Sequence, residues 1–133
     1  MQRLLGLPVF LTLLSGLWSC GEDPTLAEVN TQVFSVSCVF SSCHSGPTPR
    51  AGLNLTSEVY QALVGVPSTE KPSAMRVVAG APDASFLLDK LLGRNLPQGP
   101  ANEPEWTAMP PDGRLEDQRI DLIRDWIEAG ALP

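Results

Sequence analysis

Apolar residues recur at intervals of three or four positions in four segments of the chain, a spacing typical of helices that bury one face. The first segment opens at Thr25, which can form a capping box with Glu28. Its apolar positions are Leu26, Val29, Val33 and Val36, with Phe34 beside them. The spacing predicts a helix that runs directly into Cys38.

Two short helices are predicted in the middle of the chain. A loop rich in proline and glycine covers residues 46–52, after which Thr56 or Ser57 can cap a helix that passes through Tyr60 and Leu63. The next helix opens at residues 82–85, where proline precedes aspartate and serine, and Gly93 is its stop signal.

The last helix is predicted from near Leu115 to Gly130, with three isoleucines and Trp126 on its apolar face. Residues 94–114 before it form a long loop that contains Trp106 and Met109. A loop of this length inside a small domain usually has a function.

No segment alternates apolar and polar residues as a half-buried strand does, and no internal repeat is visible. The predicted fold class is therefore all-α, small and loop-rich. Short helices joined by proline and glycine loops supply few large apolar side chains. A chain of this kind needs a disulfide, a metal or a cofactor to complete its core.

The N-terminal residues predict an export signal. Arg3 supplies a positive start, and residues 4–14 are apolar but shorter than the roughly 20 residues of a membrane-spanning helix. Residues 17–20 then end in Cys20 as a lipobox does. We expect residues 1–19 to be a lipoprotein signal peptide and Cys20 to be lipidated. Ordinary cleavage would instead leave Cys20 as a thiol.

This interpretation leaves residues 20–24 as a short tether and residues 25–133 as one domain. Gly21 rather than aspartate follows the lipobox, which resembles lipoproteins sorted to the outer membrane. We expect a membrane-anchored lipoprotein that faces the periplasm.

The net charge of the chain limits the classes of partner that it can bind. Residues 1–19 contain only Arg3 among the charged residues, so the remainder carries eight Lys and Arg against fifteen Asp and Glu, formally −7. An acidic chain without a basic cluster argues against nucleic acid as a partner. Membrane attachment would then depend on the lipid at Cys20, since no polybasic segment is present.

Cys38 and Cys43 are followed at once by His44, the only histidine of the chain. Two thiols and an adjacent imidazole are what covalent haem attachment needs, because each thiol can add to one vinyl group and the imidazole can reach the iron. Two residues usually separate the cysteines, whereas four do here, and these would have to loop outward.

Other chemistry remains open for this pair. A disulfide between Cys38 and Cys43 would leave His44 without a role and suits an oxidising compartment. A zinc site is one ligand short. A redox-active thiol pair prefers two intervening residues at a helix start.

The order of these segments resembles class I c-type cytochromes, and more closely the single-haem c-type domains of bacterial exported lipoproteins. The resemblance covers roughly residues 25–132. It is carried by Cys38, Cys43, and residues 44–46, 51–55, 78–87, 109–111 and 123–131.

The resemblance implies one covalent haem c, with the N- and C-terminal helices packed across each other. His44 would be the proximal iron ligand, its second ring nitrogen donating to a backbone carbonyl of residues 47–49. Met109 would be the distal ligand, with Met75 as its rival. Arg50, Arg76 and Arg94 are candidate partners for the haem propionates.

The implied function is one-electron transfer outside the cytoplasm to redox partner proteins, without catalysis. Two alternatives belong to other classes. One is a haemless lipoprotein with a Cys38–Cys43 disulfide that acts as a structural or interaction module. The other is a haem sensor or peroxidase-like enzyme, which needs an open iron position that Met109 would close.

Overall fold

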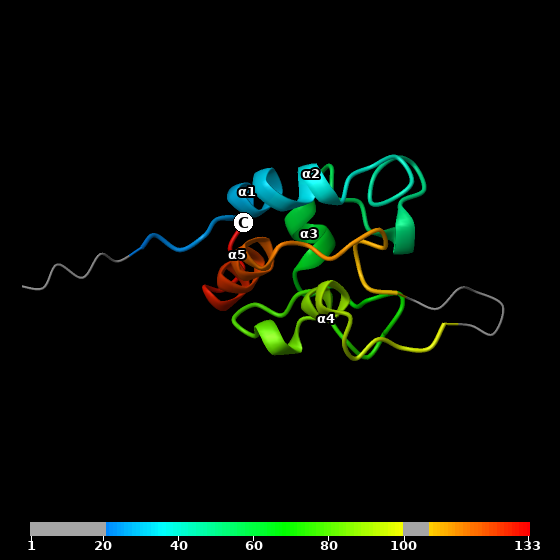
Figure 1. The fold of residues 1–133 in the computed structure, drawn as a ribbon. Coiled ribbons are helices and arrows are strands. Elements are labelled where there is room, and N and C mark those ends of the chain that lie inside the picture. The colour runs from blue at the N-terminus through cyan, green and yellow to red at the C-terminus, as the bar shows by residue number, and fades with distance from the viewer. Residues whose placement is uncertain (1–20, 100–106) are drawn as a thin grey trace, which may run out of the picture.

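The computed structural model describes residues 21–99 and 107–133. Within these residues the chain is helical and loop-rich, without strands and with only two isolated bridges, Val64 with Val77 and Pro67 with Met75. The all-α fold class is thus confirmed (Figure 1). The predicted signal peptide, Cys20 and Trp106 lie outside the described residues.

A continuous helical run opens the fold. It consists of α1 (Leu26–Val29), a π-helical turn η1 (Asn30–Phe34) and α2 (Ser35–Ser37). The predicted capping box is confirmed, since the Thr25 hydroxyl accepts from Glu28 N–H at 3.2 Å and the Glu28 carboxylate accepts from Thr25 N–H at 2.8 Å. The run ends at Cys38, as predicted.

The π turn changes which side chains this run buries. Ser35 N–H donates to the carbonyl of Asn30, five residues back, so the turn holds one residue more than an α-helical turn. Val33 and Phe34 are both buried in consequence. Val36, predicted on the apolar face, is instead 50% exposed. Counting three and four positions from Phe34 reaches Ser37 and Cys38, which therefore face inward.

The second helix, α3 (Val59–Leu63), starts later than predicted. Neither Thr56 nor Ser57 caps it. The Asn54 side chain accepts from both the amide and the hydroxyl of Thr56, at 2.8 and 2.6 Å, which occupies that hydroxyl in a local turn. Glu58 precedes the helix in a left-handed conformation.

The remaining helices follow the predicted bounds closely. The third segment divides into a 3-10 turn η3 (Pro82–Ala84) and α4 (Phe86–Leu92), and Gly93 ends α4 with φ 65°. The last helix is α5 (Asp117–Glu128). None of the helices in residues 21–99 and 107–133 has the length and apolar character to span a bilayer.

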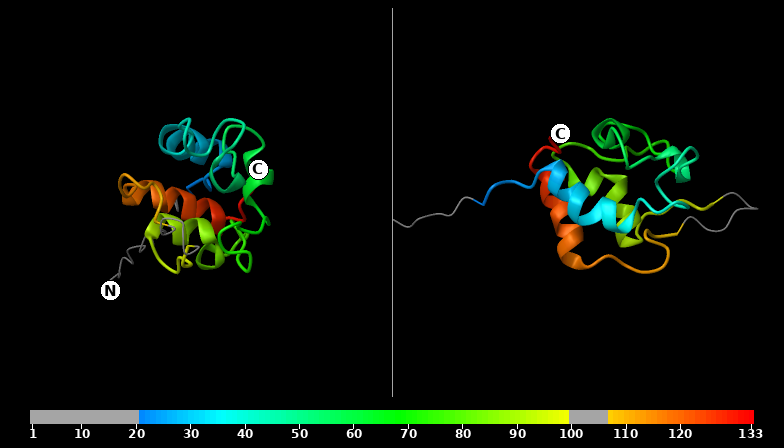
Figure 2. Two further views of the ribbon diagram at one scale, coloured as in Figure 1. Left: turned by 90° about the vertical axis from the view of Figure 1, so that its right-hand side faces the viewer. Right: turned by 90° about the horizontal axis from the view of Figure 1, so that it is seen from above.

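The N-terminal helical run crosses α5, as the view from above shows (Figure 2). Side chains of the two elements share one apolar core with α3 and α4. Its fully buried members include Val29, Val33, Phe34, Leu63, Leu88, Ile123, Trp126 and Ile127. The Trp126 indole N–H also donates to the carbonyl of Leu132 at 2.8 Å, which fastens the C-terminal residues to the helix.

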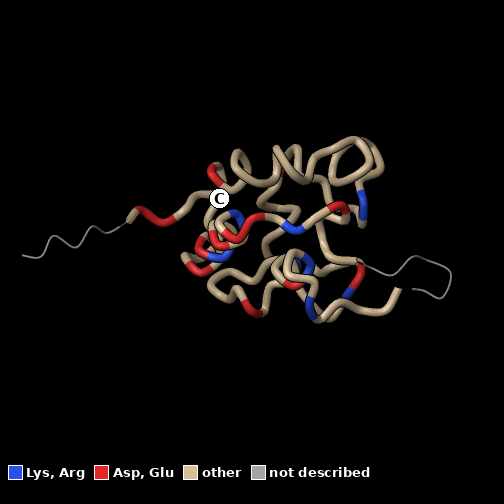
Figure 3. Tube along the Cα trace, viewed as in Figure 1, with Lys and Arg blue, Asp and Glu red and all other residues tan. Residues whose placement is uncertain are grey.

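Acidic residues are most numerous along α5 and just before α1 (Figure 3). Those at the start of α5 are exposed, and Arg114 and Arg119 pair with Asp117 and Glu116. Such exposed pairs add little stability.

Replacing Trp126 with alanine should lower the free energy of unfolding by about 3–5 kcal/mol, because the change leaves a cavity where α5 meets the N-terminal run. Urea unfolding followed by circular dichroism measures the loss. Val36→Ala is the control, and it should cost less than about 0.5 kcal/mol because this side chain is half exposed. Equal losses in the two variants would contradict the described core.

Candidate functional site

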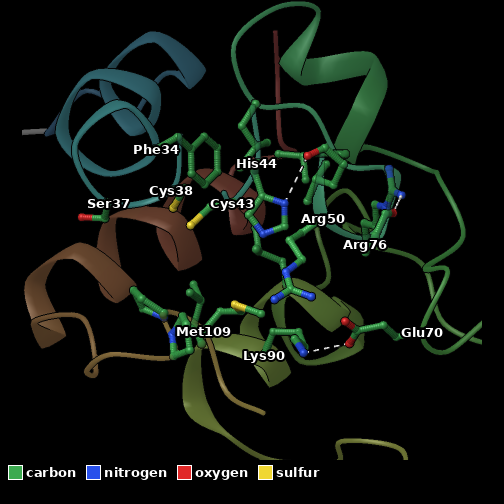
Figure 4. A pocket seen from close by; sticks show the side chains of 18 of the residues that line it. Phe34, Ser37, Cys38, Cys43, His44, Arg50, Glu70, Arg76, Lys90 and Met109 are labelled. Atoms are coloured by element: carbon green, nitrogen blue, oxygen red, sulfur yellow. Dashed lines mark hydrogen bonds and ion pairs between the residues drawn. The ribbon is translucent and has the colours of Figure 1, made fainter. Parts of the chain in front are cut away.

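A cavity of about 720 Å³ lies among the helical run, α4, and the loops around residues 38–55 and 107–112. It is within the range of ligand pockets. Most of its wall is apolar, including Phe34, Leu53, Leu55, Leu63, Phe86 and Ile123. Cys38, Cys43, His44 and Met109 all line it, although 71 positions separate the first from the last. Figure 4 shows these side chains around one space.

The segment from Cys38 to His44 is a closed loop. His44 N–H donates to the carbonyl of Cys38 at 3.0 Å, and Cys43 N–H donates to that of Phe40 at 2.8 Å. Of the four residues between the cysteines, Phe40, Ser41 and Ser42 are exposed. These residues form the exposed part of the loop, and Phe40 and Ser42 also border the cavity. The two sulfurs lie near each other at one edge of the cavity (Figure 4).

Both cysteines of this loop are free thiols in the described chain. Burial, and to a smaller extent the neighbouring Cys43, raises the pKa of Cys38 to about 11. The Cys38 thiol is therefore protonated at neutral pH, whereas a reactive dithiol needs the thiolate.

His44 presents one ring nitrogen to the cavity because the other is bonded. Its Nδ1 lies 3.1 Å from the carbonyl oxygen of Leu53. A carbonyl can only accept, so Nδ1 carries the proton and Nε2 keeps the lone pair that a metal requires. The acceptor was expected among residues 47–49, and this was wrong: left-handed Ala51 and Gly52 turn the chain back and bring Leu53 beneath the ring.

The loop that supplies this acceptor is itself held by side chains. The Ala51 carbonyl accepts from the hydroxyl of Thr69 at 2.9 Å and from the guanidinium of Arg76 at 3.1 Å. Arg76 also donates to the carbonyl of Ala62, at the end of α3, at 2.8 Å. These bonds fix the position of Leu53 and so the orientation of the His44 ring.

The His44 imidazole favours its neutral form. Burial lowers its pKa below the ordinary 6.5, and this outweighs the opposing effects of the Leu53 and Arg50 carbonyls and of the Glu70 charge. A neutral ring is the form that binds metal.

Met109 lies across the cavity from His44 (Figure 4). Its N–H donates to the carbonyl of Lys90 at 2.8 Å, which ties it to α4. The preceding Ala108 packs on the end of α4, where a Cβ at Gly93 would lie 3.3 Å from the Ala108 Cβ. Met75, the rival ligand, is 40% exposed and lies outside the cavity wall.

The cavity wall contains two further polar residues whose place there was not predicted from the sequence. Lys90 is buried, and its ammonium donates to the Glu70 carboxylate and to the carbonyl of Thr107, each at 2.7 Å. Lys90 falls four positions after Phe86, and this helical spacing could have marked it as facing the core. No local pattern identifies Glu70, because its partner is 20 positions away.

The charged side chains of the wall are Arg50, Arg76, Lys90, Glu70 and Asp112. Cations thus outnumber carboxylates there, although the whole chain has a net charge of −6. Arg50 points into the cavity (Figure 4). Arg94, the third candidate for propionate binding, instead pairs with Asp83 and Asp89 outside the wall.

This donor set fits a metalloporphyrin better than a bare metal ion. Within the part of the chain that the structure describes, no group of three or more His, Cys, Asp or Glu side chains could hold an ion. A porphyrin would bring its own nitrogen ligands, so His44 and Met109 could complete the coordination of its metal. The apolar wall could hold its ring, the two thiols could bond its vinyl groups, and the cationic residues of the wall could pair with its carboxylates.

No protein-family model, curated protein or solved structure matches this chain at a significant level.

In the haem-free protein the single imidazole should titrate below pH 6.5, because burial disfavours its charged form. The unfolded chain then binds more protons than the folded one between this lowered pKa and 6.5. The free energy of unfolding should therefore fall as the pH is lowered through that window. Imidazole NMR resonances and urea unfolding measure both effects. His44→Gln should remove this pH dependence, and a titration at or above pH 6.5 would contradict it.

Proposed function

We propose that this protein is an exported, membrane-anchored c-type cytochrome with one covalent haem, which carries one electron at a time outside the cytoplasm. The observation that supports it most strongly is that Cys38, Cys43, His44 and Met109 line one apolar cavity. In this proposal the helical run and α5, crossed over each other, enclose the haem with α4.

The chain's own residues would do three things for such a cofactor. Cys38 and Cys43 would hold it covalently at one edge. His44 would bind the iron through Nε2, with the ring orientation set by the bond from Nδ1 to Leu53. Met109 would bind from the facing side through its thioether, a soft ligand that favours ferrous iron and raises the potential.

When bound, haem c supplies the one-electron Fe(III)/Fe(II) couple. If His44 and Met109 both bound the iron, no position would remain for a substrate, and the protein would transfer electrons without catalysis. The apolar wall excludes water from the ring. Arg50 and Arg76 line the cavity and would neutralise the haem carboxylates.

Location and partners follow from the sequence expectations. A lipid on Cys20 would hold the protein at the periplasmic face of the outer membrane. Acidic residues along α5 favour redox partners of complementary positive charge, and the negative net charge of the chain argues against nucleic acid as a partner.

Covalent haem should be found in protein produced from the full chain in a host that matures c-type cytochromes. A pyridine haemochrome spectrum and an intact mass measure it. Cys38→Ser or Cys43→Ser should each leave a single thioether, and the double variant should lose its haem on acidic solvent extraction. Cys20→Ser is the matched control and should keep both thioethers.

A different result would contradict the prediction of covalent haem. Protein without covalent haem in which Cys38 and Cys43 are recovered as a disulfide would support the haemless alternative.

Met109→Ala should abolish the weak far-red absorption typical of methionine-ligated ferric haem, and it should lower the midpoint potential. Met75→Ala is the matched control and should leave both unchanged, since Met75 lies outside the cavity wall. Optical spectra and redox titration measure the two properties. Loss of the band in the Met75 variant alone would show that the distal ligand is Met75.

A further inference from the structure

Lys90 is an unusual residue for the interior of so small a domain. It lies in α4 with 8% of its surface exposed, and its ammonium donates to the Glu70 carboxylate and the Thr107 carbonyl, each at 2.7 Å. Lysine is rarely buried to this degree unless it is paired. The Glu70 side chain is itself only 15% exposed, so both charges are largely removed from water.

Lys90 holds the segment of residues 107–109 at both ends. Its ammonium binds the Thr107 carbonyl, while its own backbone carbonyl accepts from Met109 N–H at 2.8 Å. Ala108, between these two contacts, packs on Gly93. The three residues are therefore fixed to α4 at successive positions, and Met109 faces the cavity.

Net stability does not explain a buried ion pair here. Removing two charges from water costs about as much as their attraction returns, and apolar residues of similar size often serve as well or better. An apolar side chain at position 90 would fill the space, but it could not donate to the Thr107 carbonyl. The contact that Lys90 provides and an apolar residue could not is the hydrogen bond to Thr107, which fixes the position of residues 107–109.

We propose that Lys90, neutralised by Glu70, is the positioning residue for the Met109 thioether. Its buried ammonium and its backbone carbonyl together hold residues 107–109 so that Met109 lines the cavity that His44 also lines. This inference rests on the proposed function in one respect, since it assigns Met109 to the iron. The two hydrogen bonds of Lys90 with residues 107–109 do not depend on haem.

The test compares Lys90→Met with the double variant Glu70→Gln/Lys90→Met. The single variant leaves the Glu70 carboxylate buried and unpaired, which lowers stability for a reason unrelated to Met109. The double variant removes that charge and still lacks the donor to Thr107. It therefore carries the test even where the single variant fails to fold.

In haem-free protein, amide hydrogen exchange at Met109 should become about 10- to 100-fold faster in the double variant, the change expected for loss of one charged hydrogen bond. In haem-loaded protein the same variant should keep its covalent haem but lose most of the far-red band and have a lower midpoint potential. Exchange in the core of α5 should stay unchanged.

Lys71→Met is the matched control. The Lys71 ammonium also donates to a backbone carbonyl, that of Asn95 at 3.2 Å, and does not line the cavity. This variant should keep Met109 exchange and the far-red band as in the unmodified protein.

Two results would overturn the inference. One is unchanged Met109 exchange and an intact far-red band in the double variant, which would mean that the segment holds its position without Lys90. The other is equal acceleration of exchange in the Lys71 variant. Absence of covalent haem from the unmodified protein would overturn the proposed function instead. The exchange measurement would still test whether Lys90 holds residues 107–109 in position.

Discussion

Val29, Val33 and Phe34 of the N-terminal helical run share one buried core with Trp126 and its neighbours on α5, and this contact joins the two ends of the domain. The cavity lies among the helical run, α4 and α5, and the loops around residues 38–55 and 107–112 complete its wall. The helical run ends at Cys38, and the segment before α5 carries Met109. Because the core fixes where both elements lie, it also fixes which thiols and which thioether can meet in one space.

The π turn η1 determines which side chains of the helical run reach the cavity. Without the π turn, a regular helix would bury Val36 and turn the end of the run elsewhere. The additional residue in the turn places Phe34 in the core and directs Cys38 to the cavity edge. Irregular turns of this kind cost some hydrogen-bond quality and recur at functional positions.

Several polar residues of the wall hold the segments that present other side chains to the cavity. Arg76 and Thr69 hold the loop that presents the Leu53 carbonyl to His44, and Lys90 holds the segment that presents Met109. Each side of the proposed iron site thus has its own supporting hydrogen bonds. Such supporting contacts decide how well ligands keep their orientation, so they matter as much as the ligands.

Features that depend on local chemistry could be predicted from the sequence: the capping box at Thr25, the stop at Gly93, the absence of strand patterns, and the pair of thiols beside His44. Packing was needed to show which methionine lines the cavity, which carbonyl accepts from His44, and that Lys90 is buried against Glu70. These two groups of features differ in the range of the interactions behind them. Caps and helical periodicity act over three or four residues, whereas these contacts join residues 9 to 20 positions apart or more, and only the packed core brings them together.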